Sequence, residues 1–161
     1  TQYGTGTLNG RNVFGVNWIN VGYYSFETNK LHSFQLILTD RADTGAGNFD
    51  FEFNYDQILW ETGGASGGSN GLGGNSARAG WSNGSNASFE LTGSAVNGAF
   101  LDDGPYSLVS GSRNSGVAGR YIFQVRNGAI DPPTGTIPEP GSLLLAGLAL
   151  GAAGLLRRRA R

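Results

Sequence analysis

The sequence predicts an all-β domain, folded as an antiparallel two-layer sandwich-like structure with long glycine-rich loops, and one hydrophobic helix at its C-terminus. Residues 48–56 alternate aromatic and polar side chains with the period of two that is typical of a half-buried strand. Asn-Gly pairs, which favour hairpin turns, separate several strand-like segments. Glycine accounts for 28 of the 161 residues, and this composition indicates long loops between the strands.

The first two segments are predicted to form a hairpin. Residues 2–8 and 12–21 flank Asn9-Gly10, and a type I′ turn needs positive φ at both of its central positions. The second segment carries apolar side chains on both faces, which indicates a central strand. A polar turn is expected at residues 27–30, and the next strand is predicted at residues 32–40.

The clearest strand, residues 48–56, places four aromatic side chains on one face. The next large apolar groups, Ile58 and Trp60, follow with the opposite parity. A bulge or bend near Asp56-Gln57 is therefore predicted, because one extra residue restores the inward direction. Residues 63–74 contain seven glycines in twelve and are expected to form a flexible surface loop. No GK[ST] sequence follows them, so a phosphate-binding loop is not supported.

The second half of the domain is predicted with less regular structure. Short strands or loop pieces are expected at residues 75–82, 87–91 and 95–100, and a last strand at residues 120–126. The predicted organisation is a domain at residues 1–127, an extended linker at 128–137 and a C-terminal segment at 138–161.

No catalytic set is predicted, and the chain is expected not to be an enzyme. His32 is the only histidine, and a lone histidine at the start of a strand is more often a surface or capping group. Asp50 and Glu52 lie side by side on one strand face, where a solvated outer face is the simpler interpretation. The absence of cysteine from the sequence removes disulfides, thiolate metal sites and cysteine nucleophiles together. No cofactor is expected.

Two binding alternatives remain open. Calcium takes six to eight oxygen ligands, and four aspartates in or beside loops are candidates: Asp40, Asp43, Asp102 and Asp103. No EF-hand or nonapeptide calcium motif is present, so no metal is predicted. Trp60 and Trp81 are candidate glycan contacts because aromatic faces stack on sugar rings, although packing in the core of a glycine-rich sandwich is the simpler interpretation of both.

The last segment, residues 137–161, reads IPEPGSLLLAGLALGAAGLLRRRAR. Its apolar part starts with Gly141, Ser142 and Leu143 and ends at Leu156. Four arginines follow: Arg157, Arg158, Arg159 and Arg161. An apolar run that ends in arginines indicates a membrane helix with its end on the cytoplasmic side. The run is shorter than the roughly 20 residues of a spanning helix. A buried core helix is the alternative, but leucines lie on all sides of the run.

This segment resembles the PEP-CTERM sorting signal of exopolysaccharide-producing Gram-negative bacteria. The resemblance rests on Pro138, Glu139 and Pro140, the short apolar helix and the terminal arginines. It implies that an exosortase, a membrane processing enzyme, recognises the Pro-Glu-Pro element and removes the tail after transient anchoring in the inner membrane. The body then reaches the cell surface or the extracellular matrix. Because sorting requires export, we expect further residues before Thr1, including an export signal and part of the domain.

The body resembles the extracellular NIDO (nidogen-type) domain. The resemblance runs from about Trp18 to Arg126 and is carried by the segments FNYDQILWETG, ARAGWSNG and SGVAGRYIFQVRNG in the family's order. It implies matrix association or cell–matrix adhesion without catalysis, and it brings no defined ligand residues.

The net negative charge of the body limits the classes of partner that it is expected to bind. Without the four tail arginines, 7 basic residues face 12 acidic ones, which disfavours nucleic acid and anionic lipid. The expected partners are the exosortase, the membrane through the C-terminal helix, and extracellular polysaccharide or matrix components. The sequence thus predicts a non-enzymatic surface or matrix protein. A carbohydrate-binding module that acts on exopolysaccharide is the alternative.

Overall fold

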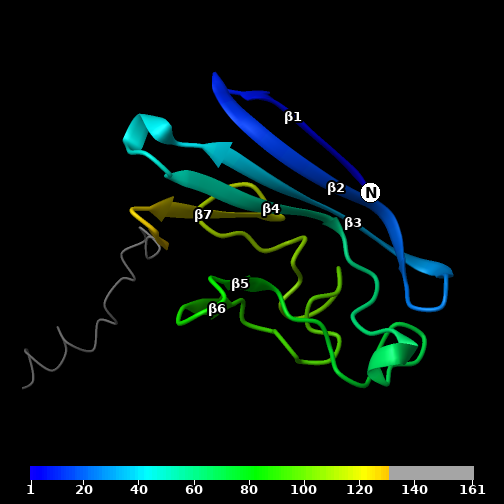
Figure 1. Cartoon of the computed structure of the whole chain (residues 1–161). Coiled ribbons are helices and arrows are strands. Elements are labelled where there is room, and N and C mark those ends of the chain that lie inside the picture. Colours follow the sequence, from blue (N-terminus) through cyan, green and yellow to red (C-terminus); the bar gives the residue numbers. More distant parts are fainter. Residues whose placement is uncertain (131–161) are drawn as a thin grey trace, which may run out of the picture.

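The computed structural model describes residues 1–130, which form one six-stranded antiparallel sheet faced by a second layer of loops and a small hairpin (Figure 1). The sheet order is β1-β2-β3-β4-β7-β8, and β5 pairs with β6. The strands are β1 (Gln2–Leu8), β2 (Arg11–Tyr23), β3 (Glu27–Asp40), β4 (Phe49–Gln57), β5 (Gly80–Ser82), β6 (Ser88–Glu90), β7 (Arg120–Arg126) and β8 (Ala129–Ile130). Two short 3₁₀ helices, η1 (Ala42–Thr44) and η2 (Gly64–Ser66), lie in loops.

The predicted N-terminal hairpin is confirmed. Leu8 pairs with Arg11, and Asn9 and Gly10 both have positive φ, at 50° and 75°. The register places Thr5 opposite Phe14 and continues to the start of β1. A local turn signal therefore sets the pairing of two whole strands, as the two-residue loop requires.

The turn between β2 and β3 lies earlier than predicted. Residues 27–30 belong to β3, and the chain reverses at residues 24–26, where Tyr23 pairs with Glu27. Ser25 and Phe26 have φ values of 78° and 61°, which non-glycine residues adopt infrequently. The turn was missed because neither residue carries the usual glycine or asparagine signal.

Three irregularities interrupt the strand register of the sheet. The predicted bulge near Asp56-Gln57 is confirmed, because Phe34 pairs with Tyr55 while Ser33 pairs with Gln57. Asp56 is the extra residue, and Ile58 beyond it is buried. The other two lie in the pairing of β2 with β3, between Trp18 and Val21 and between Val21 and Tyr23, and neither was predicted.

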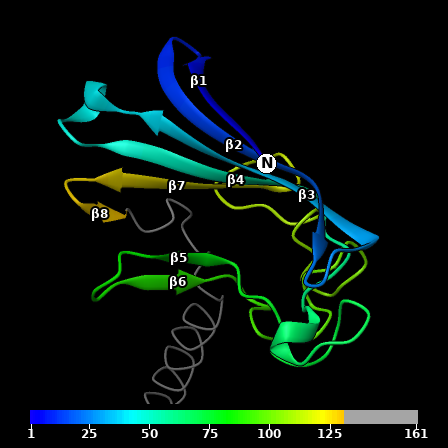
Figure 2. The ribbon, with the colours of Figure 1, turned by 45° about the vertical axis from the view of Figure 1, so that its right-hand side comes forward.

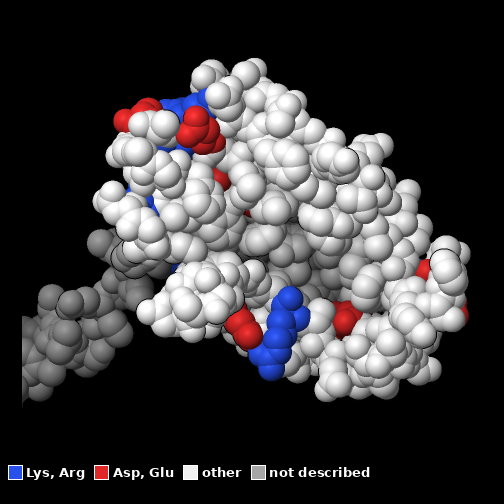
Figure 3. Space-filling model, in the orientation of Figure 1, with Lys and Arg blue, Asp and Glu red and all other residues white. Residues whose placement is uncertain are grey.

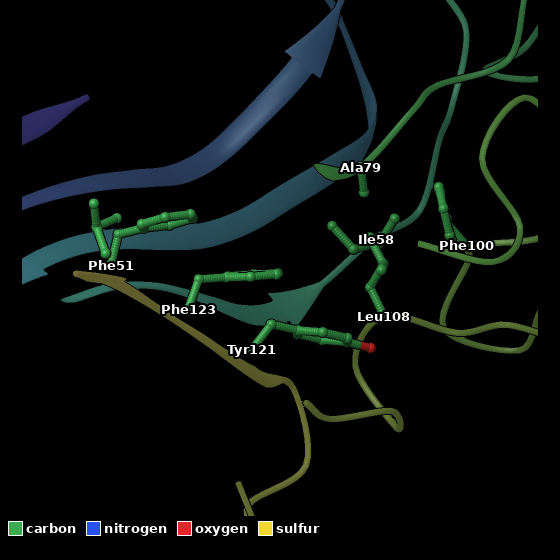
Figure 4. Close-up of a cluster of buried hydrophobic side chains, with 8 residues drawn as sticks. Phe51, Ile58, Ala79, Phe100, Leu108, Tyr121 and Phe123 are labelled. Atoms are coloured by element: carbon green, nitrogen blue, oxygen red, sulfur yellow. The ribbon is translucent and has the colours of Figure 1, made fainter. Parts of the chain in front are cut away.

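The hydrophobic core lies between the inner face of β4 and β7 and the second layer (Figure 4). The sheet contributes Phe51, Tyr121, Phe123 and Val125, and the second layer contributes Ile58, Ala79, Phe100 and Leu108. The rings of Phe51 and Phe123 stack with their centroids 4.9 Å apart. Phe51, Phe53 and Tyr55 of the predicted aromatic row thus face this core, whereas Phe49 at the end of the row is 37% exposed. The period of two results from the alternation of side chains along a strand.

The second layer is mostly loop. It consists of the segment between β4 and β7, and Figure 2 shows its hairpin, β5 and β6, facing the inner side of the sheet. Residues 95–100, expected as a short strand or a loop piece, form turns. The all-β, antiparallel prediction is confirmed, and strands form only a small part of the layer opposite the sheet.

The chain after β7 continues the sheet for two residues. Asn127 and Gly128 turn with φ values of 51° and 76°, so Arg126 pairs with Ala129. The folded domain therefore extends into the range expected as a linker. Among the described residues, none of the helices has the length and apolar character of a membrane span. The expected C-terminal helix lies outside the described residues.

Candidate functional site

His32 is buried, with 8% of its surface exposed, so the expectation of a surface position is wrong. Its ring stacks on Trp60 at a centroid distance of 4.2 Å, and its Nδ1 accepts the Leu59 N–H at 3.2 Å. Burial lowers the pKa of His32 from 6.5 to about 4, so the ring is neutral at pH 7. No carboxylate bonds to it among the described residues. It acts as an acceptor that holds the chain leaving β4.

Asp50 and Glu52 lie on the outer face of the sheet, and both are paired with arginines. Asp50 accepts bonds from Arg41 at 2.7 Å and from Arg126 at 2.6 Å. Glu52 is 9% exposed and accepts two bonds from Arg120, at 3.0 and 2.6 Å. These carboxylates join neighbouring strands through charge-assisted hydrogen bonds. The expected solvated face is therefore an ion-paired one.

A row of polar side chains continues from Glu52 across the same face. Asn54 donates through its Nδ2 to Glu52 and to Gln35, and Gln35 donates to Asn17 at 2.7 Å. These bonds satisfy groups on β2, β3, β4 and β7, so the row supports the sheet. Figure 3 shows that charged side chains gather mainly near the end of the sheet that carries η1. Most of that view is uncharged.

Trp60 and Trp81, the candidate glycan contacts, are both half-buried and packed against the protein's own rings. Trp60 lies between His32 and Tyr23, and its Nε1 donates to the Val21 carbonyl at 3.0 Å. Trp81 stacks on Phe89 with centroids 6.4 Å apart. Both tryptophans therefore have a packing role in the loop layer.

The four candidate calcium ligands lie in two separate places. Asp43 pairs with Arg11 and Arg41 at 3.0 Å each, and these arginines hold the pKa of its carboxyl well below the usual range. Asp40 accepts the Ala42 N–H at 2.9 Å in the same loop. Asp102 instead accepts the Ile58 N–H at 2.7 Å, and Asp103 is exposed in the adjoining turn. Within residues 1–130, no group of three or more His, Cys, Asp or Glu side chains is placed to hold a metal ion.

The glycine-rich loop, residues 63–74, is tied down by its own backbone. The Gly71 carbonyl accepts the N–H groups of Glu61 and Thr62 at 2.8 and 3.1 Å, and Asn75 N donates to the Ser66 carbonyl at 3.0 Å. A side chain at Gly71 would come within 2.8 Å of the Trp60 Cβ. The glycines therefore allow close approach of the loop to Trp60, and no phosphate cradle leading into a helix is formed.

The aromatic groups that the structure does expose are not the tryptophans. Tyr3, Tyr24, Phe26 and Tyr106 are 79%, 66%, 100% and 49% exposed. These four residues were not among the candidates from the sequence, which were the two tryptophans. Their positions in turns or on an edge strand were the available signal, since such places leave a side chain without a partner layer.

The residues expected to act in sorting, Pro138, Glu139, Pro140 and the tail that follows them, lie outside the described residues. The family model described as "PEP-CTERM protein-sorting motif" matches residues 136–160. The family model described as "Nidogen-like domain" matches residues 2–127.

Curated relatives point to the same domain. The chain is 36% identical to alpha-tectorin of Mus musculus and of Homo sapiens over 129 residues, which cover 76% of this chain. It is 35% identical to alpha-tectorin of Gallus gallus over 124 residues, or 74% of this chain. In each case the match spans only about 5% of the relative's length. No solved structure gives a significant match.

The two family matches fit the molecule described above. The nidogen-like match covers all strands except β8, and a domain of the nidogen and tectorin type is extracellular and non-enzymatic. The sorting match begins six residues after the last described one. The chain therefore belongs to the nidogen-like (NIDO) domain family and carries a C-terminal PEP-CTERM protein-sorting motif.

Proposed function

We propose that this chain is a non-enzymatic cell-surface or extracellular-matrix protein of a Gram-negative bacterium that contributes to adhesion or cell–matrix association. The two family matches support an exported protein that is sorted by an exosortase. The single observation that carries the proposal is the joining of an extracellular type of domain to a sorting motif in one chain. The arginine-paired carboxylates and the neutral, buried His32 give no support to a hydrolytic function.

The parts of the tail are proposed to act in three steps: membrane insertion, recognition by the exosortase and cleavage. The apolar run from Gly141 to Leu156 enters the inner membrane, and the arginines after it stay on the cytoplasmic side because moving their charge through hydrocarbon is costly. Pro138, Glu139 and Pro140 then present an extended segment to the exosortase, because prolines disfavour a helix there. Cleavage frees the folded domain for the surface or the matrix.

Replacement of Glu139 tests this order. The Glu139→Ala variant should accumulate at full length in the membrane fraction, while the wild type is trimmed and exported. Glu27→Ala is the matched control, because Glu27 is exposed and makes no ion pair among the described residues. Normal trimming and export of the Glu139 variant would contradict the recognition role.

Extracellular polysaccharide and other matrix components are the proposed partners of the domain. A carbohydrate-binding module is the alternative function, with Trp60 and Trp81 as candidate contacts. Loss of glycan-array binding in Trp81→Ala, with an unchanged unfolding midpoint, would favour these contacts. Because Trp81 packs on Phe89, a lowered midpoint would assign the loss to unfolding instead.

A further inference from the structure

A surface pocket of about 330 Å³ opens beside the strand β7, away from both tryptophans. It is bounded by residues 105–108 and 110–112 and by Leu91 and Thr92, and Tyr121 lies at its inner side. The volume is at the small end of the range for ligand sites. None of the residues that line it carries a charge at neutral pH, and its polar groups are hydroxyls and backbone atoms. A small, uncharged ligand fits this chemistry.

Tyr106 forms an aromatic wall of the pocket that is open to solvent and fixed in place. It is 49% exposed, and its N–H donates to the Ala99 carbonyl at 2.9 Å. Gly93, with φ at 105°, lies against it: a Cβ there would come within 2.8 Å of the Tyr106 Cβ and 3.2 Å of its Cδ2. One side of the ring is thus packed on backbone, and the remaining surface is available for stacking.

Tyr121 supplies a hydroxyl at the inner side of the pocket. The residue is only 5% exposed, and its ring packs edge-on against Tyr55 with centroids 5.5 Å apart. Its hydroxyl is directed toward the segment that carries Leu108 (Figure 4). No hydrogen-bond partner of this hydroxyl occurs among residues 1–130. Burial raises the pKa of Tyr121, so the phenol keeps its proton and can donate.

With no partner among residues 1–130, the Tyr121 hydroxyl bonds with water or with a ligand that enters the pocket. A ligand oxygen that replaces this water keeps the hydrogen bond. Gly111 lies directly over the phenol oxygen, since a Cβ at Gly111 would collide with it. The hydroxyls of Ser110 and Ser112 already donate to backbone carbonyls, at 3.5 and 3.0 Å, so they remain acceptors toward the pocket. The pocket therefore combines a donor hydroxyl and acceptor hydroxyls with the exposed ring of Tyr106.

We propose that this pocket binds one neutral pyranose unit of an extracellular polysaccharide. The Tyr106 ring stacks on the apolar C–H face of the sugar, and the Tyr121 hydroxyl donates to a sugar oxygen at the inner side. The lack of charge in the lining selects against uronates and phosphorylated sugars, because nothing would pair with their anionic groups. The inference rests on the proposed matrix role and names the class of ligand that the domain recognises.

The test is a titration of the ¹⁵N-labelled full chain, kept in one detergent without a sugar headgroup, with neutral pyranosides. The probes are glucose, galactose, mannose, xylose and N-acetylglucosamine, with glucuronate as the anionic comparison. At least one neutral sugar should shift the amide signals of Tyr106, Gly111 and Tyr121 in a saturable way. Its affinity should fall about tenfold or more in Tyr106→Ala and roughly three- to tenfold in Tyr121→Phe.

Tyr3→Ala is the matched control, because Tyr3 is an exposed tyrosine on the opposite edge of the sheet. It should bind the sugar with unchanged affinity. The proposal is overturned if no neutral sugar shifts these signals, if the shifts lie elsewhere, if glucuronate binds as well, or if Tyr121→Phe keeps full affinity. Tail trimming in the same variants is assayed separately. A failure here with normal export overturns the sugar site alone, whereas defective sorting of the wild type overturns the proposed function.

Discussion

Glu61 is predicted to hold the loop layer together through a buried carboxylate. The residue is 4% exposed, and its Oε2 and Oε1 accept the backbone N–H groups of Gly98 and Phe100, both at 2.7 Å. Phe100 is itself almost fully buried in the core. These two bonds therefore fasten the segment after β4 to a turn that is 37 residues further along the chain.

The Glu61→Gln substitution measures this contribution with little change in shape. A glutamine side chain accepts through one oxygen only, so one N–H loses its acceptor and faces an amide donor. A bond to a charged acceptor contributes about 1.5–3 kcal/mol, and an unpaired buried donor costs about 1–3 kcal/mol. We expect a loss of about 2–3 kcal/mol for Glu61→Gln. Glu61→Ala, which removes both acceptors and leaves a cavity, should cost about 4–5 kcal/mol.

Urea unfolding of the full-length chain at pH 7, followed by near-ultraviolet circular dichroism, gives these differences. A thermal scan should show a midpoint lowered by roughly 6–12 °C in Glu61→Gln. Glu27→Gln is the control at an exposed site, where changes stay within about 0.5 kcal/mol. A Glu61→Gln variant as stable as the control would refute the assignment of a stabilising role to this carboxylate.

Two further predictions concern pH and backbone geometry. Because burial lowers the pKa of His32 from 6.5 to about 4, the unfolded chain binds a proton in this pH window that the fold excludes. Stability should therefore fall by about 1–2 kcal/mol between pH 7 and pH 5, and His32→Asn should flatten this part of a pH series of urea midpoints; an unchanged slope would argue against it. Gly119 has φ at 76°, and a Cβ there would collide with the Tyr55 carbonyl, so Gly119→Ala should cost about 2–4 kcal/mol. Gly84→Ala, with the same φ but open space, should cost only about 1 kcal/mol, and equal losses would show that the collision is relieved.

Features governed by neighbouring residues could be predicted from the sequence. The Asn9-Gly10 turn and the aromatic row of β4 depend on backbone preference and on the period of a strand, which a short window contains. The extra residue at Asp56 was found because burial requires Ile58 to face inward again. The family and its sorting motif were recognised from short segments that occur in a fixed order.

Features governed by distant residues could not be predicted. The second layer consists mainly of loops, and their shape depends on bonds such as those of Glu61 with Gly98 and Phe100. His32 was expected at the surface because its burial depends on Trp60, which comes 28 residues later in the chain. The pocket of Tyr106 and Tyr121 is lined by residues of a turn and of a strand that are distant in the sequence, so no local pattern predicts it.

The folded domain is expected to reach the surface only after its tail has been removed. Intact-mass and peptide mass spectrometry of the protein recovered from cell-surface material measures this removal. The mature C-terminus should lie at or close to Pro138, Glu139 and Pro140, with the arginines from Arg157 onward absent. Surface protein that still ends in Arg161 would show that the tail is not removed.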